Sequence, residues 1–153
     1  MLYKMGKAQN TRKYNKISIK KGGKTAKNTN KKRKIHKKTV IIGKIFADWC
    51  GHCVRLKSEW AKMKTKIKHN MGRSLKHMTV EFVELGDTQE NQMRNITVDQ
   101  LVSDFNKKHF PMGENELSSE GYPTIFRICN KKIDYYTGER TANNLYKWAT
   151  QKC

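Results

Sequence analysis

Two cysteines separated by two residues, Cys50 and Cys53, lie where a β-branched apolar run gives way to a segment with helical spacing. A helix N-terminus leaves backbone N–H groups unpaired, and these groups, with the helix dipole, stabilise a thiolate. A cysteine at such a turn is expected to have a depressed pKa and to attack disulfides at neutral pH. The spacing therefore predicts a redox-active pair, in which Cys50 attacks and Cys53 resolves.

The patterns on both sides of this pair predict alternating strands and helices. Residues 39–46 form a short apolar run that is rich in β-branched side chains and bounded on both sides, which indicates a buried strand. Leu56, Trp60, Met63 and Ile67 recur at steps of three and four, which predicts a helix from Cys53 to about residue 70. Similar reasoning gives strands at 78–85, 124–129 and 132–136, helices at 98–109 and 141–151, a loop at 111–120 and a hairpin at 130–131. The predicted class is α/β, in the order β-α-β-α-β-β-α.

The pentapeptide Trp-Cys-Gly-His-Cys resembles the active site of the thioredoxin superfamily, in the form typical of protein disulfide isomerases. Two weaker motifs follow in the family's order: Gly-Tyr-Pro-Thr at 121–124 resembles the loop with the cis-proline, and Tyr-Thr-Gly-Glu-Arg at 136–140 resembles the family's ending. The resemblance implies a thioredoxin-like domain at 39–153. It also implies a set of site residues: Cys50 and Cys53 as catalytic, Trp49, Gly51 and His52 as redox-tuning, and Tyr122 and cis-Pro123 as substrate-binding.

The chain departs from the family at two positions that bear on Cys53. Six residues before Cys50 the family usually has a buried acid that takes the proton from the second cysteine, and here that position is Lys44. The lysine that accompanies the acid on the next strand is replaced by Glu84. Because an unpaired buried lysine is costly, we expect Lys44 and Glu84 to pair and Glu84 to accept the proton from Cys53. In the alternative, Lys44 snorkels to the surface and Glu84 is merely exposed.

A partly charged His52 imidazole beside the Cys50 thiolate is expected to stabilise the reduced form. The disulfide should then be more oxidising than that of thioredoxin, by about 90 mV or about 4 kcal/mol for isomerases of this type. The competing interpretation is half of a zinc site, but Cys129 and Cys153 lack the spacing of a second ligand pair. No metal and no cofactor is predicted. Cys129 is expected to be a small core residue, and Cys153 an exposed one able to form an intermolecular disulfide.

Residues 1–38 differ in composition from the remainder. They hold fifteen of the 33 Lys and Arg residues and none of the 13 Asp and Glu residues. Because this segment has few apolar side chains to bury, we expect it to be disordered. Its charge favours binding of nucleic acid or another polyanion, and the alternative is a solvated extension. The densest basic cluster, which also resembles a nuclear import signal, contains Lys31, Lys32, Arg33, Lys34, Lys37 and Lys38.

Two classes of function follow from these observations. The favoured class is a thiol–disulfide oxidoreductase that acts on protein thiols and disulfides and exchanges electrons with a redox partner, either a sulfhydryl oxidase or a reductase. The alternative class is a polyanion-binding or particle-structural protein with a vestigial thioredoxin-like body. No apolar run reaches the length of a signal peptide or a membrane span, so we expect a cytoplasmic or virion location, with the nucleus as a further candidate, and no secretion. The Lys- and Asn-rich composition resembles that of redox proteins carried by large DNA viruses.

Overall fold

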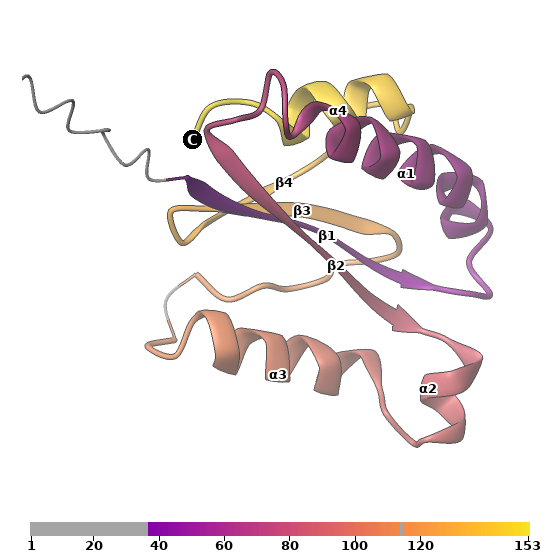
Figure 1. Ribbon diagram of the computed structural model, residues 1–153. Coiled ribbons are helices and arrows are strands. Elements are labelled where there is room, and N and C mark those ends of the chain that lie inside the picture. Colours follow the sequence, from indigo (N-terminus) through magenta and orange to yellow (C-terminus); the bar gives the residue numbers. More distant parts are fainter. Residues whose placement is uncertain (1–36, 114) are drawn as a thin grey trace, which may run out of the picture. The chain divides into compact units, whose positions relative to one another are not determined.

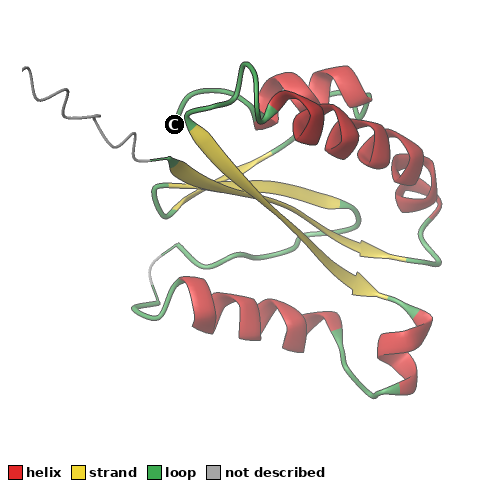
Figure 2. Ribbon diagram, in the orientation of Figure 1, coloured by secondary structure: helices red, strands yellow, loops and turns green. Residues whose placement is uncertain are grey.

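The computed structural model of the chain describes residues 37–113 and 115–153, in which one mixed sheet lies between two layers of helices (Figure 1). The predictions of disorder and polyanion binding for the basic tail concern residues outside this range, except for Lys37 and Lys38, which are both exposed. Helices α1 (Gly51–Asn70) and α4 (Ala142–Ala149) cover one face of the sheet. Helices α2 (Gln89–Met93) and α3 (Val98–His109) lie on the other side (Figure 2).

The sheet has the strand order β2-β1-β3-β4. Strand β1 is parallel to β2 and antiparallel to β3, and β3 is antiparallel to β4. The predicted hairpin is present, because Asn130 and Lys131 both have a positive φ, as a tight two-residue β-turn requires. The strands comprise β1 (Lys38–Ala47), β2 (Met78–Asp87), β3 (Thr124–Cys129) and β4 (Lys132–Tyr135). The α/β class and the thioredoxin-like order of elements are thus confirmed.

Two details of the predicted elements change. Strand β1 begins at Lys38, one residue inside the segment assigned to the tail from composition. Helix α2 was not predicted, because five residues are too few to show a hydrophobic period. Its start is fixed by the Thr88 side chain, which accepts a hydrogen bond from the backbone N–H of Asn91 at 3.2 Å.

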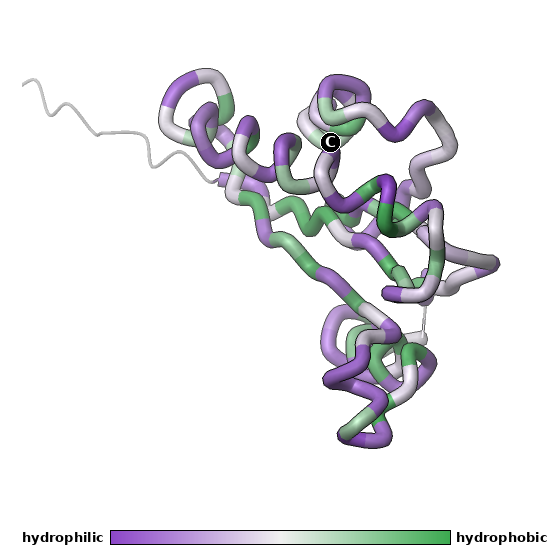
Figure 3. Tube along the Cα trace, turned by 90° about the vertical axis from the view of Figure 1, so that its right-hand side faces the viewer, coloured by the Kyte–Doolittle hydropathy of each residue, from purple (hydrophilic) through white to green (hydrophobic). Residues whose placement is uncertain are grey.

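Strand β1 is central and is buried on both faces, which explains its continuous apolar run. Val40 and Ile42 face the layer of α1 and α4, whereas Ile41 and Ile45 face the layer of α3. On α1 the buried residues follow the predicted helical spacing. In Figure 3, which colours the chain by hydropathy, hydrophilic and hydrophobic residues alternate along the turns of the helices. This packing fixes the end of β1 against the start of α1, where the two cysteines lie.

Candidate active site

Cys50 is the N-cap residue of α1, at the turn that follows β1. Its carbonyl oxygen accepts hydrogen bonds from the backbone N–H groups of Cys53 and Val54, at 2.9 and 3.0 Å. Helix α1 is 20 residues long and has no acidic side chain in its first turn. The positive end of its dipole therefore acts on the Cys50 sulfur without an opposing carboxylate in that turn.

The surroundings of Cys50 favour its thiolate. The hydrogen bond from the Cys53 thiol lowers the pKa of Cys50, and it outweighs the burial that would raise it. The backbone N–H groups of Cys53 and His52 and the charge of Arg140 add to this lowering of the pKa. In total the pKa of Cys50 lies below that of an ordinary thiol, which is the condition for attack on a disulfide near neutral pH.

The pKa of Cys53 is shifted in the opposite direction. Burial, together with its hydrogen bond to Cys50, raises the pKa of Cys53 to about 11. A backbone hydrogen bond from Ala47 and the charge of Lys44 act the other way. Both cysteines are free thiols in this structure. The two neighbouring sulfurs thus differ in the charge that they carry, with the negative charge favoured on Cys50.

The loop before β3 lies against Cys50. The Tyr122–Pro123 peptide bond is cis, as predicted, and the Cys50 thiol donates to the carbonyl oxygen of Tyr122 at 3.6 Å. Trp49 packs edge-on against Tyr122, with ring centroids 5.8 Å apart. The Trp49 indole N–H donates to Asp87 at 2.8 Å, which anchors the ring to the end of β2. Trp49 is nevertheless 69% exposed, so an apolar surface borders the cysteine pair.

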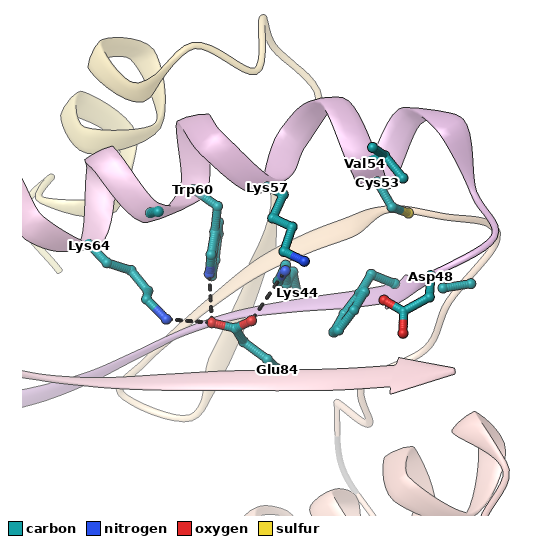
Figure 4. A pocket seen from close by; sticks show the side chains of 11 residues that line it. Lys44, Asp48, Cys53, Val54, Lys57, Trp60, Lys64 and Glu84 are labelled. Atoms are coloured by element: carbon teal, nitrogen blue, oxygen red, sulfur yellow. Dashed lines mark hydrogen bonds and ion pairs between the residues drawn. The ribbon is translucent and has the colours of Figure 1, made fainter. Parts of the chain in front are cut away.

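The expected pairing of Lys44 with Glu84 is present in the structure. The Lys44 ammonium lies 3.2 Å from one Glu84 carboxylate oxygen, and the Lys44 side chain is only 6% exposed. The other oxygen accepts from Lys64 at 2.6 Å and from the Trp60 indole at 3.0 Å (Figure 4). These groups line a cavity of about 590 Å³ that also reaches Cys53. Lys44 therefore does not snorkel, and it lies close enough to affect the second cysteine.

This cluster argues against Glu84 as the proton acceptor. Burial alone would raise the pKa of Glu84, but the hydrogen bonds from Lys64 and Trp60 and the charge of Lys44 hold the pKa below its ordinary value. A carboxylate held in its ionised form by three donors is a weak base. The group of this cluster that acts on Cys53 is Lys44, whose charge lowers the Cys53 pKa.

The His52 ring is hydrogen-bonded to a neighbouring side chain of α1. The Arg55 guanidinium donates to Nδ1 of His52 at 2.8 Å. His52 acts on Cys50 through its backbone N–H, and the side-chain charge acting there is that of Arg140. Sequence reasoning missed this role of Arg140, although the residue belongs to one of the motifs that carry the family resemblance.

The expectations for the other two cysteines are wrong in part. Cys129 is buried at the end of β3, as expected, but it forms an intramolecular disulfide with Cys153. Their Cα atoms are 5.9 Å apart across a sequence separation of 24 residues. Cys153 follows α4, which returns to the sheet beside β3, and this return places the two sulfurs together. Neither of these two cysteines lines the cavity at Cys53.

Residues 37–113 and 115–153 contain no group of three or more His, Cys, Asp or Glu side chains arranged to hold a metal ion. Over the same residues no helix has both the length and the apolar character needed to span a membrane.

Known proteins similar to this chain carry related domains. The chain is 23% identical over 118 residues to protein disulfide isomerase-like 1-4 of Arabidopsis thaliana, a match that spans 77% of the chain and 15% of that relative. It is 28% identical over 120 residues to the protein disulfide-isomerase A6 homolog of Drosophila melanogaster, spanning 74% of the chain and 21% of the relative. The chain thus corresponds to about a fifth or less of these relatives' lengths.

Among solved structures, the first thioredoxin domain of mouse protein disulfide-isomerase A4 aligns with a TM-score of 0.45 and 21% identity, over 72% of this chain and 60% of that one. The sequence profile of the thioredoxin family matches residues 22–151, which is most of the chain. With the cysteine pair at the start of α1 and the cis-proline loop beside it, this match shows that the chain belongs to the thioredoxin family.

Proposed function

We propose that this chain is a thiol–disulfide oxidoreductase that acts on protein substrates through Cys50 and Cys53. The observation that carries the proposal is the contrast between the two sulfurs: the pKa of Cys50 is lowered at the start of α1, whereas the pKa of the buried Cys53 is raised to about 11. The contrast supports attack by Cys50 and resolution by Cys53. The disulfide isomerases among the relatives support the same class of reaction.

In the reductive direction the exchange has two steps. The Cys50 thiolate forms a bond to one sulfur of the substrate disulfide, and the other substrate sulfur leaves as a thiolate. Cys53 then loses its proton to solvent and attacks Cys50, which releases the second substrate thiolate. The substrate gains two electrons and Cys50–Cys53 becomes a disulfide. Oxidation of a substrate dithiol is the reverse, and a sulfhydryl oxidase or a reductase would restore the starting form.

The reduction potential of the Cys50–Cys53 disulfide is predicted to be higher, and therefore more oxidising, than that of thioredoxin. Stabilisation of the Cys50 thiolate favours the reduced form, and therefore makes the disulfide a better oxidant. Equilibration of the protein with glutathione buffers should give a potential about 90 mV above that of thioredoxin. A potential equal to that of thioredoxin would contradict the expected poise while leaving the exchange reaction itself intact.

The exchange reaction is tested by reduction of insulin disulfides with dithiothreitol as electron donor. The wild-type protein should accelerate the reduction, and Cys50→Ser should return it to the uncatalysed rate. Ser58→Ala, an equally small change at an exposed position of α1, is the matched control and should retain full activity. Activity that survives Cys50→Ser would refute the proposed function.

Lys44 is proposed to assist Cys53 by favouring its thiolate. The charge of Lys44 lowers the pKa of Cys53 but is the weakest of the influences on it, so Lys44→Met should slow resolution of the mixed disulfide about two- to threefold. Glu84→Gln removes the negative charge that pairs with the Lys44 ammonium. Resolution of the mixed disulfide in this variant should be as fast as in the wild-type protein, or faster. Stopped-flow measurement of resolution in both variants separates two roles: slowing by Glu84→Gln alone would instead identify the carboxylate as the proton acceptor.

A second candidate function rests on the charge of residues 1–38. Fifteen cationic side chains without one acidic residue support binding of nucleic acid or another polyanion, and such binding should weaken steeply as salt is raised. Measurement of DNA affinity against salt concentration tests it. Binding that survives Cys50→Ser but is lost on deletion of residues 1–38 would show that the two functions reside in separate parts of the chain.

A further inference from the structure

A second cavity next to the cysteine pair has a different lining from the one at Lys44. It has a volume of about 430 Å³ and lies between the first turns of α1 and the loop that joins β4 to α4. Leu56, which is buried, contributes an apolar side chain to the lining. The lining residues are His52, Arg55, Leu56, Thr137, Gly138 and Arg140.

The lining of this cavity carries positive charge without a carboxylate. Two arginines face it, and neither forms an ion pair with any residue in the described part of the chain. The acidic residues nearest to these arginines along the chain have other partners. Glu59 accepts from the Ala142 backbone N–H at 2.8 Å and pairs with Lys62. Glu139 accepts from the Asn144 side chain at 3.3 Å. The positive charge of the cavity is therefore left for an external anion.

The guanidinium of Arg55 is partly oriented. One of its N–H groups donates to His52 Nδ1 at 2.8 Å, and the ring thereby restricts the side chain. A guanidinium has five N–H donors in a planar fork, so the remaining donors of Arg55 are sufficient for a carboxylate. Arg140 supplies a second fork from the loop before α4.

The cavity lies beside the reacting sulfur. His52 is two residues from Cys50, and the charge of Arg140 acts on the Cys50 thiolate. When Cys50 forms a mixed disulfide its negative charge is lost, and Arg140 is left without that anion. A carboxylate on the substrate, a short distance from the disulfide, would replace it.

We propose that the Arg55–Arg140 cavity binds a carboxylate of the disulfide substrate, so that this protein reacts preferentially with disulfides that have an acidic group close to the sulfur. The inference rests on the proposed exchange reaction and adds a substrate class to it. The carboxylate is either the side chain of an acidic residue beside a substrate cysteine or a carboxylate of glutathione. Bidentate hydrogen bonding by arginine suits both sources.

The test compares second-order rate constants for reduction of matched disulfides by the dithiol form of the full chain. One pair consists of peptides that differ only in Glu or Gln next to the disulfide cysteine. The other pair is glutathione disulfide and its carboxylate esters. We expect the acidic member of at least one pair to react about fivefold faster at low ionic strength. The preference should fall to about one in Arg55→Gln/Arg140→Gln, and persist in the control Arg73→Gln, an exposed arginine beyond the end of α1.

The ratio of the rate constants for the acidic and the neutral disulfide of a matched pair distinguishes carboxylate binding from activation of Cys50. If Arg140 acted only on the Cys50 pKa, its removal would slow acidic and neutral substrates alike and leave the ratio unchanged. A preference for the Glu peptide alone assigns the cavity to protein substrates, and one for glutathione disulfide alone assigns it to the small thiol. Equal rates within both pairs for the wild-type protein would overturn the inference, although the exchange reaction would stand. If no disulfide were reduced, both proposals would fail.

Discussion

The Cys53→Ser variant should accumulate covalent mixed disulfides with its substrates through Cys50. Cys50 retains its position at the start of α1 and its N–H donors, so it should still attack. The second step requires a thiol beside Cys50, and a serine hydroxyl cannot displace the bound sulfur. Turnover should therefore cease after a single event. Incubation with an oxidised substrate protein, followed by non-reducing electrophoresis, should show a 1:1 adduct that dithiothreitol releases.

The matched variant for this experiment is Cys50→Ser. It retains Cys53, and the burial that contributes most to the raised pKa of this thiol is unchanged by the substitution, so the protonated form of Cys53 is still favoured at neutral pH. We expect no adduct from it. Adducts of equal yield from both variants would show that the two cysteines are interchangeable, and would contradict the assignment of attack to Cys50.

Removal of the disulfide between Cys129 and Cys153 should have the largest effect on stability. A bridge across 24 residues reduces the entropy of the unfolded chain, and its loss should lower the free energy of unfolding by about 3 kcal/mol. The bridge also fixes the last turn of α4 and the segment after it, where the carbonyl oxygens of Trp148 and Gln151 accept hydrogen bonds from the buried Arg127 guanidinium at 3.0 and 3.3 Å. The Arg127 contacts would then loosen as well.

The measurement is urea unfolding of Cys153→Ser in a Cys50→Ser/Cys53→Ser background, where the structural bridge is the only disulfide in question. Added dithiothreitol should destabilise the parent by a similar amount and leave Cys153→Ser unchanged. If oxidised parent and variant unfold at the same urea concentration, the disulfide contributes nothing to the stability of the domain.

Most of the fold could be predicted from the sequence, because its strong signals are local. The apolar run that became β1 and the three-four spacing on α1 follow from burial on two faces and on one face, respectively. The Lys44–Glu84 pair could also be predicted from the sequence, since a buried lysine needs a partner on the neighbouring strand. In the parallel register of β1 and β2, Lys44 lies directly beside Glu84.

The remaining features depend on contacts between distant parts of the chain. Cysteine spacing alone does not fix disulfide connectivity, so the bond between Cys129 and Cys153 became visible only when α4 was placed beside β3. The contribution of Arg140 was missed for a similar reason: the charge that acts on Cys50 comes from this residue, ninety positions further along the chain. No periodicity or spacing connects such residues.

The rate of alkylation of Cys50 as a function of pH tests the central claim most directly. In the reduced wild-type protein, iodoacetamide should modify Cys50 at pH 6 far faster than it modifies glutathione, because the hydrogen bond from the Cys53 thiol, the backbone N–H groups of Cys53 and His52 and the charge of Arg140 hold the Cys50 pKa below that of an ordinary thiol. The rate should level off at a lower pH than that of glutathione. A Cys50 that reacts at pH 6 no faster than glutathione, with a rate still rising above pH 8, would contradict the account.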